Sequence, residues 1–236
     1  MSSYKILAKY YDELIIDPEG VLQWADFTER FLNKEGSVLE LASGSGAISE
    51  ELLKRGYTLT LSDLSEEMLL RAKEKFGNSQ KIVVADMRDF SVEEPYDGIL
   101  CYNDSLNYLT EEDEVRSCFH SVNKALKDDG IFLFDVHTLE RLTEFEEEYI
   151  EEGEVLDAEY QWSILAEEDY ITHHLTFWVN GETFMEEHVQ RVYPKELLKQ
   201  WLKEAGFETE IFTDFTKNEW AKGEKYCFVC RKKAGR

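Results

Sequence analysis

The feature that most constrains the fold is an alternation of short apolar segments with amphipathic segments between residues 37 and 136. The apolar segments have the length of buried strands, and the segments between them have the spacing and caps of helices. Strands that alternate with helices in this way are typical of a parallel sheet covered by helices on both faces. We therefore expect a Rossmann-like α/β fold, with strands at 37–42, 57–62, 81–85, 96–102 and 131–136 and helices at 47–55, 65–76 and 110–126. Ser65 and Thr110 are the predicted N-caps of the last two helices.

The rest of the chain extends this core without adding a second domain. Residues 4–14 and 21–33 have helical patterns, and we interpret residues 1–34 as a helical lid, because they precede the core and are not needed to complete the sheet. Residues 137–193 change to the alternation of antiparallel strands, at 158–164, 170–179 and 182–193. A helix at 194–206 and strands at 207–213 and 225–231 follow. Residues 1–236 thus form a single domain, with a mainly parallel seven-stranded sheet and an antiparallel β insertion after strand five.

The insertion contains the dipeptide Asn180-Gly181, which is the strongest short hairpin signal. A two-residue turn pairs Val179 with Glu182 and fixes every pair further out. One face then carries a carboxylate beside two imidazoles, from the residues Glu186, His173 and His188. We expect this face to be a candidate acceptor-binding surface. A solvated face without a function is the alternative.

Glycine and acidic residues stand where the predicted strands end. The carboxyl ends of parallel strands meet at one edge of the sheet, where ligands bind. Gly44 and Gly46 let the backbone approach a ligand and lead into a helix N-terminus. Asp63 can accept both hydroxyl hydrogens of a ribose, and Asp86 can accept from the exocyclic amine of adenine. These ends predict a nucleoside site, with a ring contact from the Met87 amide and apolar walls from Leu64, Met68 and Met87.

Two kinds of cofactor use such a site, dinucleotides and S-adenosylmethionine. The dinucleotide pattern G-x-G-x-x-G requires a third glycine, and Ser49 occupies that position. Glu40, four residues before Gly44, would repel a pyrophosphate but suits an ammonium and a sulfonium. The charge of Glu40 thus favours S-adenosylmethionine. A nicotinamide-dependent oxidoreductase and a non-catalytic S-adenosylmethionine-binding protein are the alternatives.

The motif series Glu40-x-x-x-Gly44-x-Gly46, Asp63, Asp86-Met87 and residues 103–109 resembles that of class I S-adenosylmethionine-dependent methyltransferases. Within this group the chain is similar to small bacterial enzymes near the glycine/sarcosine and sugar-amine N-methyltransferases. Residues 7–12 resemble the N-terminal helix that those enzymes fold over the cofactor.

The resemblance implies a role for each matched position. Glu40 and the turn after it would hold the methionine moiety, and Tyr11 would close over that end. The Asn103 backbone would lie near the transferable methyl group. The implied cofactor-binding set is Tyr11, Glu40, Ala42, Gly44, Gly46, Asp63, Leu64, Met68, Asp86, Met87 and Asn103.

The acceptor side has fewer signals. In-line displacement of a methyl group needs positioning in a closed pocket, plus a base only where the acceptor must lose a proton. The sequence assigns no catalytic residue, and Tyr108 and His137 are candidates. Asp104 and Asp135 are the acids placed for a metal-assisted reaction, but one pair is too little, and we expect no metal. The expected reaction is methyl transfer to nitrogen or oxygen of a small molecule.

The charge of the chain narrows the partners. The sequence has 26 Lys and Arg residues against 50 Asp and Glu, a formal net charge of -24. Such a surface repels phosphate backbones and anionic lipid, so neither nucleic acid nor membrane is expected. Four cysteines without a signal-peptide pattern indicate reduced thiols in the cytoplasm. The sequence does not decide between a monomer and a homodimer.

Overall fold

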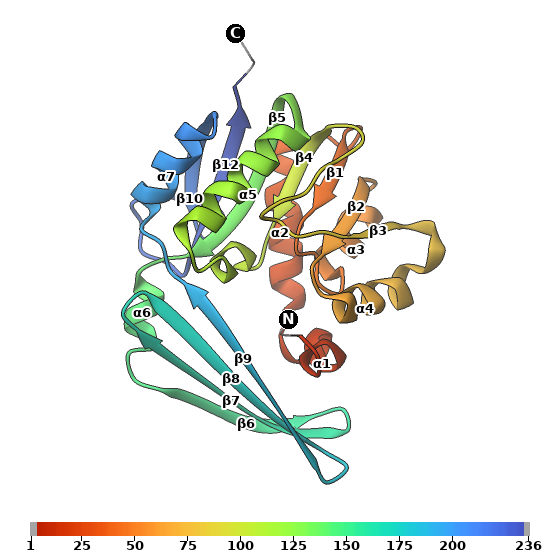
Figure 1. Ribbon diagram of the computed structural model, residues 1–236, viewed down its shortest axis with the longest axis vertical. Helices are drawn as coiled ribbons and strands as arrows, with labels where there is room; N and C mark the ends of the chain where they lie inside the picture. Colours follow the sequence, from red (N-terminus) through yellow and green to blue (C-terminus); the bar gives the residue numbers. More distant parts are fainter. Residues whose placement is uncertain (1–3, 234–236) are drawn as a thin grey trace.

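The computed structural model describes residues 4–233 and places an eight-stranded sheet at the centre of the molecule (Figure 1). The strand order is β11-β10-β12-β5-β4-β1-β2-β3. Pairing is parallel from β3 to β5 and antiparallel where β12 meets β5 and β10. The strands are β1 (Ser37–Glu40), β2 (Thr58–Asp63), β3 (Lys81–Val84), β4 (Tyr96–Cys101), β5 (Leu126–His137), β10 (Phe207–Thr213), β11 (Lys217–Asn218) and β12 (Lys225–Lys232). The predicted fold class is confirmed.

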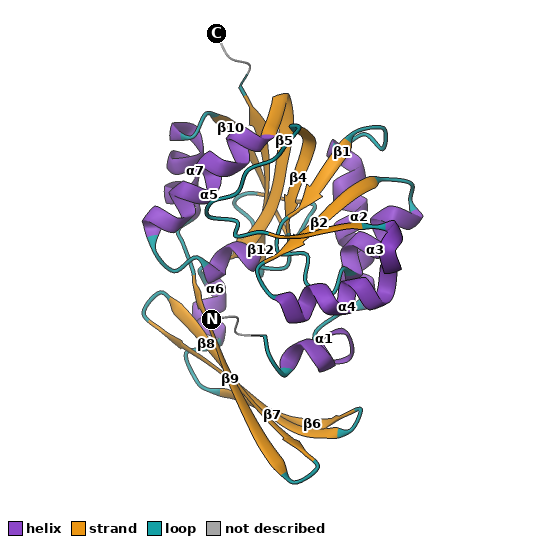
Figure 2. Ribbon diagram, turned by 45° about the vertical axis from the view of Figure 1, so that its right-hand side comes forward, coloured by secondary structure: helices purple, strands orange, loops and turns teal. Residues whose placement is uncertain are grey.

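Helices cover both faces of this sheet (Figure 2). One core cluster joins the sheet to α5 and α7, and a second joins it to α2, α3 and α4. Phe134 lies in the first cluster and stacks on Phe132 and Phe228, at ring-centroid distances of 4.7 and 4.6 Å. The helices are α1 (Leu7–Leu14), α2 (Pro18–Phe31), α3 (Ala47–Lys54), α4 (Glu66–Phe76), α5 (Glu112–Ala125), α6 (Glu140–Glu144) and α7 (Lys195–Glu204), with short 3₁₀ turns η1 (Gly77–Ser79) and η2 (Ser105–Tyr108).

Local side-chain contacts set where the helices begin. The predicted cap of α4 is confirmed, because the Ser65 hydroxyl accepts the Met68 N–H at 3.2 Å. The predicted cap of α5 was wrong by one residue. Glu111, not Thr110, precedes this helix, and it forms a reciprocal capping box with Glu114.

The antiparallel insertion forms a separate four-stranded sheet below the parallel one (Figure 1). Its strands are β6 (Tyr149–Val155), β7 (Ala158–Glu167), β8 (Tyr170–Val179) and β9 (Glu182–Arg191). The predicted hairpin register is confirmed, including the pair His173 and His188. The inner face packs on α1, where Tyr10 stacks on Phe177 with ring centroids 5.0 Å apart. The outer face exposes Trp178 and Met185.

Two strands were missed by the sequence analysis. β11 has two residues, too few for a periodic pattern, and raises the predicted seven strands to eight. β6 lies in a glutamate-rich stretch whose composition does not favour a strand. The position of β6 accounts for its glutamates. It is an edge strand, and charged side chains on an edge strand oppose pairing with another chain.

We predict that Gly46→Ala destabilises the protein more than Gly56→Ala. Both glycines have a positive φ, of 79° and 95°, a conformation that costs about 1–2 kcal/mol for other residues. A Cβ at Gly46 would also lie 2.5 Å from a Phe76 ring carbon, whereas a Cβ at Gly56 meets nothing within 4 Å. Overpacking of this kind adds about 1–3 kcal/mol. Urea unfolding measures both losses, and equal losses would show that Phe76 moves aside without cost.

Candidate active site

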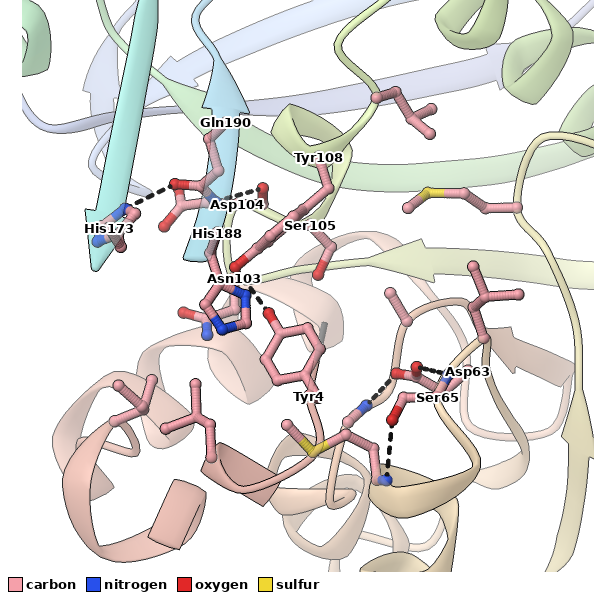
Figure 3. A pocket seen from close by; sticks show the side chains of 18 of the residues that line it. Tyr4, Asp63, Ser65, Asn103, Asp104, Ser105, Tyr108, His173, His188 and Gln190 are labelled. Carbon is pink, nitrogen blue, oxygen red and sulfur yellow. Dashed lines mark hydrogen bonds between the residues drawn. The ribbon is translucent and has the colours of Figure 1, made fainter. Parts of the chain in front are cut away.

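A cavity of about 570 Å³ lies between the carboxyl ends of the parallel strands and the inner face of the antiparallel sheet (Figure 3). The loops after β1, β2, β3 and β4 line one part of it, and β7, β8 and β9 line the opposite part. Tyr4 and Tyr11 contribute from the N-terminal segment. The cavity thus joins the predicted cofactor edge to the predicted acceptor surface.

The loop after β1 is tied to the end of β2 by Asp63. Its carboxylate accepts the N–H of Gly44 at 2.8 Å and the N–H of Ser65 at 2.8 Å. Burial raises the pKa of Asp63, and these N–H groups act in the opposite direction. A carboxylate has about four acceptor positions, so it can still accept from a ligand hydroxyl. The chain conformation is tight here, because Ala42 and Gly44 have φ values of 49° and 56°.

All of the predicted cofactor-binding residues except Glu40 and Gly46 line the cavity. Glu40 lies behind the loop, is 2% exposed, and accepts a hydrogen bond from the Ser49 hydroxyl. Burial raises the pKa of Glu40 to about 7, so a neighbouring cation would help to keep it ionised. Gly46 packs against Phe76 and shapes the turn.

Asp86 lies at the cavity wall but already has a cationic partner. Arg88 donates to both of its carboxylate oxygens, at distances from 2.6 to 3.0 Å, and this contact lowers the pKa of Asp86. Arg88 also binds Glu114 of α5. Sequence reasoning missed Arg88, although its position two residues after Asp86 places both side chains on one turn.

Tyrosine hydroxyls meet where the N-terminal segment faces the loop after β4. Tyr4 donates to the Tyr108 hydroxyl at 2.7 Å, and the Asn103 amide donates to the Tyr11 hydroxyl at 3.1 Å. Burial raises the pKa of Tyr108 to about 12. Tyr108 is therefore neutral at physiological pH and is a poor base. Tyr4 was missed, because nothing in its local sequence indicates a contact with residues a hundred positions away.

Helix α1 connects the two sheets. Its first N–H groups, on Ile6 and Leu7, donate to the Glu186 carboxylate of β9. Lys9 binds Asp157 in the turn between β6 and β7, at 2.6 Å. At the opposite end, Asp12 accepts from the Ser45 hydroxyl and pairs with Lys75 of α4. Glu186 thus holds α1, and it does not line the cavity.

The histidine face of the insertion points into the cavity, so the alternative of a solvated face was wrong (Figure 3). His173 accepts from the Trp162 indole at 3.2 Å, and its other ring nitrogen contacts Gln190 at 3.2 Å. Burial lowers the pKa of His173 to about 4, so the ring is neutral. His188 is 2% exposed and lies beneath Tyr4, with ring centroids 4.6 Å apart.

Gln190, which sequence reasoning missed, joins the insertion to the parallel sheet. Its Oε1 contacts His173 and also His137 Nε2, at 3.0 Å, and its Nε2 donates to the Asp104 carbonyl at 3.3 Å. The other nitrogen of His137 lies 3.3 Å from the Asp104 carboxylate. Both ring nitrogens of His137 and of His173 are therefore engaged, which leaves neither free to accept a proton from a substrate.

Comparisons with known proteins agree with this geometry. The family described as "Methyltransferase domain" matches residues 38–130. The chain is 37% identical, over 97% of both proteins, to the provisionally named methyltransferase YqeM of Bacillus subtilis (strain 168). A glycine/sarcosine N-methyltransferase of Parasynechococcus marenigrum (strain WH8102) is 29% identical over 50% of this chain and 45% of that protein.

Solved structures extend the likeness to the whole chain. An S-adenosylmethionine-dependent methyltransferase from Clostridium acetobutylicum ATCC 824 superposes with a TM-score of 0.83 and 25% identity, over 99% of this chain and 100% of that one. The sugar N-methyltransferase KedS8 from Streptoalloteichus sp ATCC 53650 shares the fold, with a TM-score of 0.77 at 20% identity, over 97% of this chain and 93% of that one.

The chain belongs to the S-adenosylmethionine-dependent methyltransferases. It is an enzyme that uses S-adenosylmethionine, and neither the oxidoreductase nor the non-catalytic alternative gains support. The cavity fits this cofactor, because the anchored Asp63 carboxylate has acceptor positions left and faces the same space as the apolar side chain of Met68. Among residues 4–233, no helix is both long and apolar enough to span a membrane.

We predict that α1 acts as a lid. Its ion pairs, between Lys9 and Asp157 and between Asp12 and Lys75, are partly exposed, so the helix can open locally. Addition of S-adenosylhomocysteine should slow amide hydrogen exchange of residues 7–14, with α7 as the remote control. Equal exchange of α1 with and without S-adenosylhomocysteine would contradict a lid.

Proposed function

We propose that the enzyme methylates a nitrogen atom of a small-molecule amine in the cytoplasm. The observation that carries this proposal is that two of the three histidines lining the acceptor half of the cavity, His137 and His173, have partners at both ring nitrogens. The ring of the third, His188, packs against the Tyr4 ring, and its Nε2 lies 3.4 Å from the Glu186 carboxylate. A neutral amine carries its own lone pair and needs no base before attack, whereas a hydroxyl does.

The assignment of the cofactor half follows the cavity wall. Asp63 would accept the ribose hydroxyls, Met68 and Leu64 would contact the adenine, and Asp86 with the Met87 amide would bind its edge. Glu40 would attract the ammonium group from behind the Ala42–Gly44 loop. Tyr11 would cover the methionine end and place the methyl group near the Asn103 backbone.

The acceptor half would then orient the amine. His173 and His188 belong to the inner sheet face, next to the apolar side chains of Leu175 and Ile164. When bound, S-adenosylmethionine supplies an electrophilic methyl group on a sulfonium. The protein holds the amine in line with it and excludes water through the closed α1. Relatives named for glycine, sarcosine and sugar-amine substrates support an amine acceptor.

Matched acceptors test the proposal. Tritiated S-adenosylmethionine is incubated with the enzyme and with pairs that differ in one group, glycine against glycolate and glucosamine against glucose, and then with a wider panel of such pairs. Label should enter amines and not their hydroxyl counterparts. Transfer to the hydroxyl members would overturn the choice of nitrogen, and no binding of S-adenosylhomocysteine in calorimetry would overturn the site itself.

We predict that Asp63→Ala weakens the binding of S-adenosylhomocysteine by about 2–4 kcal/mol, the sum of two hydrogen bonds to a charged group. Isothermal titration calorimetry measures the loss. The control is Asp26→Ala, which removes an exposed carboxylate of α2 outside the cavity. Unchanged affinity of the Asp63 variant would remove this residue from the cofactor site.

We predict that His173→Ala and His188→Ala lower turnover but leave the affinity for S-adenosylhomocysteine intact, because both side chains line the acceptor half. His174→Ala is the matched control, since its side chain lies on the outer face of the same hairpin beside Glu187. Tritium transfer to the preferred amine of the panel measures turnover. Losses equal to that of the His174 variant would mean that the histidine face does not act on the acceptor.

A further inference from the structure

The loop after β4 has an unfavourable backbone that needs support. Asn103 and Asp104 both have a φ of 58°, and neither is a glycine. Two successive left-handed residues of this kind cost free energy and persist where the surroundings hold them. Both residues line the cavity, at the strand end beside which the transferable methyl group is proposed to lie.

The Asp135 carboxyl group of β5 provides the support from below. Its Oδ2 accepts the Asp104 N–H at 3.1 Å, and its side chain is fully buried. The Asp104 carboxyl group folds back towards it, so the two carboxyl groups are in hydrogen-bond contact. One oxygen of each, Oδ1, is buried and accepts no hydrogen bond from residues 4–233, although Asp104 Oδ1 also lies 3.3 Å from His137 Nδ1.

Two carboxylates in contact in a buried site cannot both remain ionised at low cost. If one of the two carboxyl groups carries a proton, it can donate a hydrogen bond to the other. Such a proton would account for the Oδ1 atoms that otherwise accept none. The surroundings decide which group carries it. Lys225 Nζ lies 3.6 Å from Asp135 and 3.9 Å from Asp104, so this cation is shared. Asp104 has His137 in addition, at 3.3 Å, and is the better site for the negative charge.

We propose that Asp135 is a positioning residue that stays neutral, and that its carboxyl group accepts from the Asp104 backbone while it donates to the Asp104 carboxylate. These two hydrogen bonds hold the strained Asn103–Asp104 loop against the methyl end of the cofactor. The inference rests on the cofactor position given under Proposed function. It assigns Asp135 no contact with substrate or cofactor, because this residue does not line the cavity.

The directions of the pKa shifts agree with this arrangement. Burial and the neighbouring Asp104 raise the pKa of Asp135 well above its ordinary value. Burial alone would raise the pKa of Asp104, but His137 and Lys225 lower it below its ordinary value. The groups that face Asp135 from the packed strands and the loop are Cys101, Tyr102, Asp104, Lys225 and Cys227.

The test replaces each carboxyl group by the amide of the same shape. Asp135→Asn keeps both hydrogen bonds that a neutral Asp135 would make. Asp104→Asn removes the negative charge that His137 and Lys225 face. We expect Asp135→Asn to bind S-adenosylhomocysteine within about twofold of the wild type. Asp104→Asn and Asp135→Ala should each lose about tenfold or more, the equivalent of one lost hydrogen bond.

The pH dependence of protein stability tests the protonation state of Asp135 without any ligand. If Asp135 is protonated in the folded state and ionised in the unfolded state, the folded protein binds one more proton, and its stability falls as pH rises. Asp135→Asn has no carboxyl group at this position and therefore does not bind this extra proton. Its melting temperature should therefore equal or exceed that of the wild type, and the difference should grow between pH 6 and pH 8.

Each outcome decides the proposal. A melting temperature of Asp135→Asn below the wild type at every pH would mean that Asp135 is ionised and pairs with Lys225, which overturns it. Equal affinity of Asp135→Ala and the wild type for S-adenosylhomocysteine would overturn the positioning role. Failure of the wild type to bind S-adenosylhomocysteine would instead overturn the proposed cofactor site, and the melting temperatures would still decide the protonation of Asp135.

Discussion

The parallel pairing of β1 with β2 on one side and β4 on the other is the constraint on which the site depends. It brings the loops after these strands to one edge of the sheet, where Asp63 can accept the Gly44 N–H from the neighbouring loop. Without this pairing, the glycine loop and the acidic strand ends would be isolated turns. The same pairing gives the loop after β4 its place beside them, with Asn103 and Asp104 facing the cavity.

The cavity wall at the strand ends was predictable from the sequence because each of its positions follows from one strand and its end. Asp63 and Gly44 needed only the alternation of strands and helices, and the hairpin register needed only Asn180-Gly181. The missed residues depend on contacts between distant segments. Gln190 reaches Asp104 across 86 positions, and no local pattern predicts which of several polar side chains on a strand makes such a contact.

Glu186 shows how a correct placement can suggest an incomplete role. The register placed it on the histidine face, and the structure agrees, but its carboxylate meets the first N–H groups of α1. A negative group at a helix N-terminus is stabilised by the unpaired N–H groups there. Glu186 therefore links the sheet that faces the cavity to α1, a relation that needs the position of α1 and could not come from the hairpin alone.

Most acidic side chains of this site have a basic side chain as a partner. The chain carries a formal net charge of -24, yet Asp86 is bound by Arg88, and Asp104 faces His137 and Lys225. Glu40 differs, because burial raises its pKa to about 7 and Ser49 is its hydrogen-bond partner. A cation that arrives beside the loop would stabilise the ionised form of Glu40. Glu40 is thus an acid without a cationic partner in the described part of the chain. The ammonium group proposed to bind beside its loop would supply that partner, and the attraction between the two charges would orient the methionine end of the cofactor.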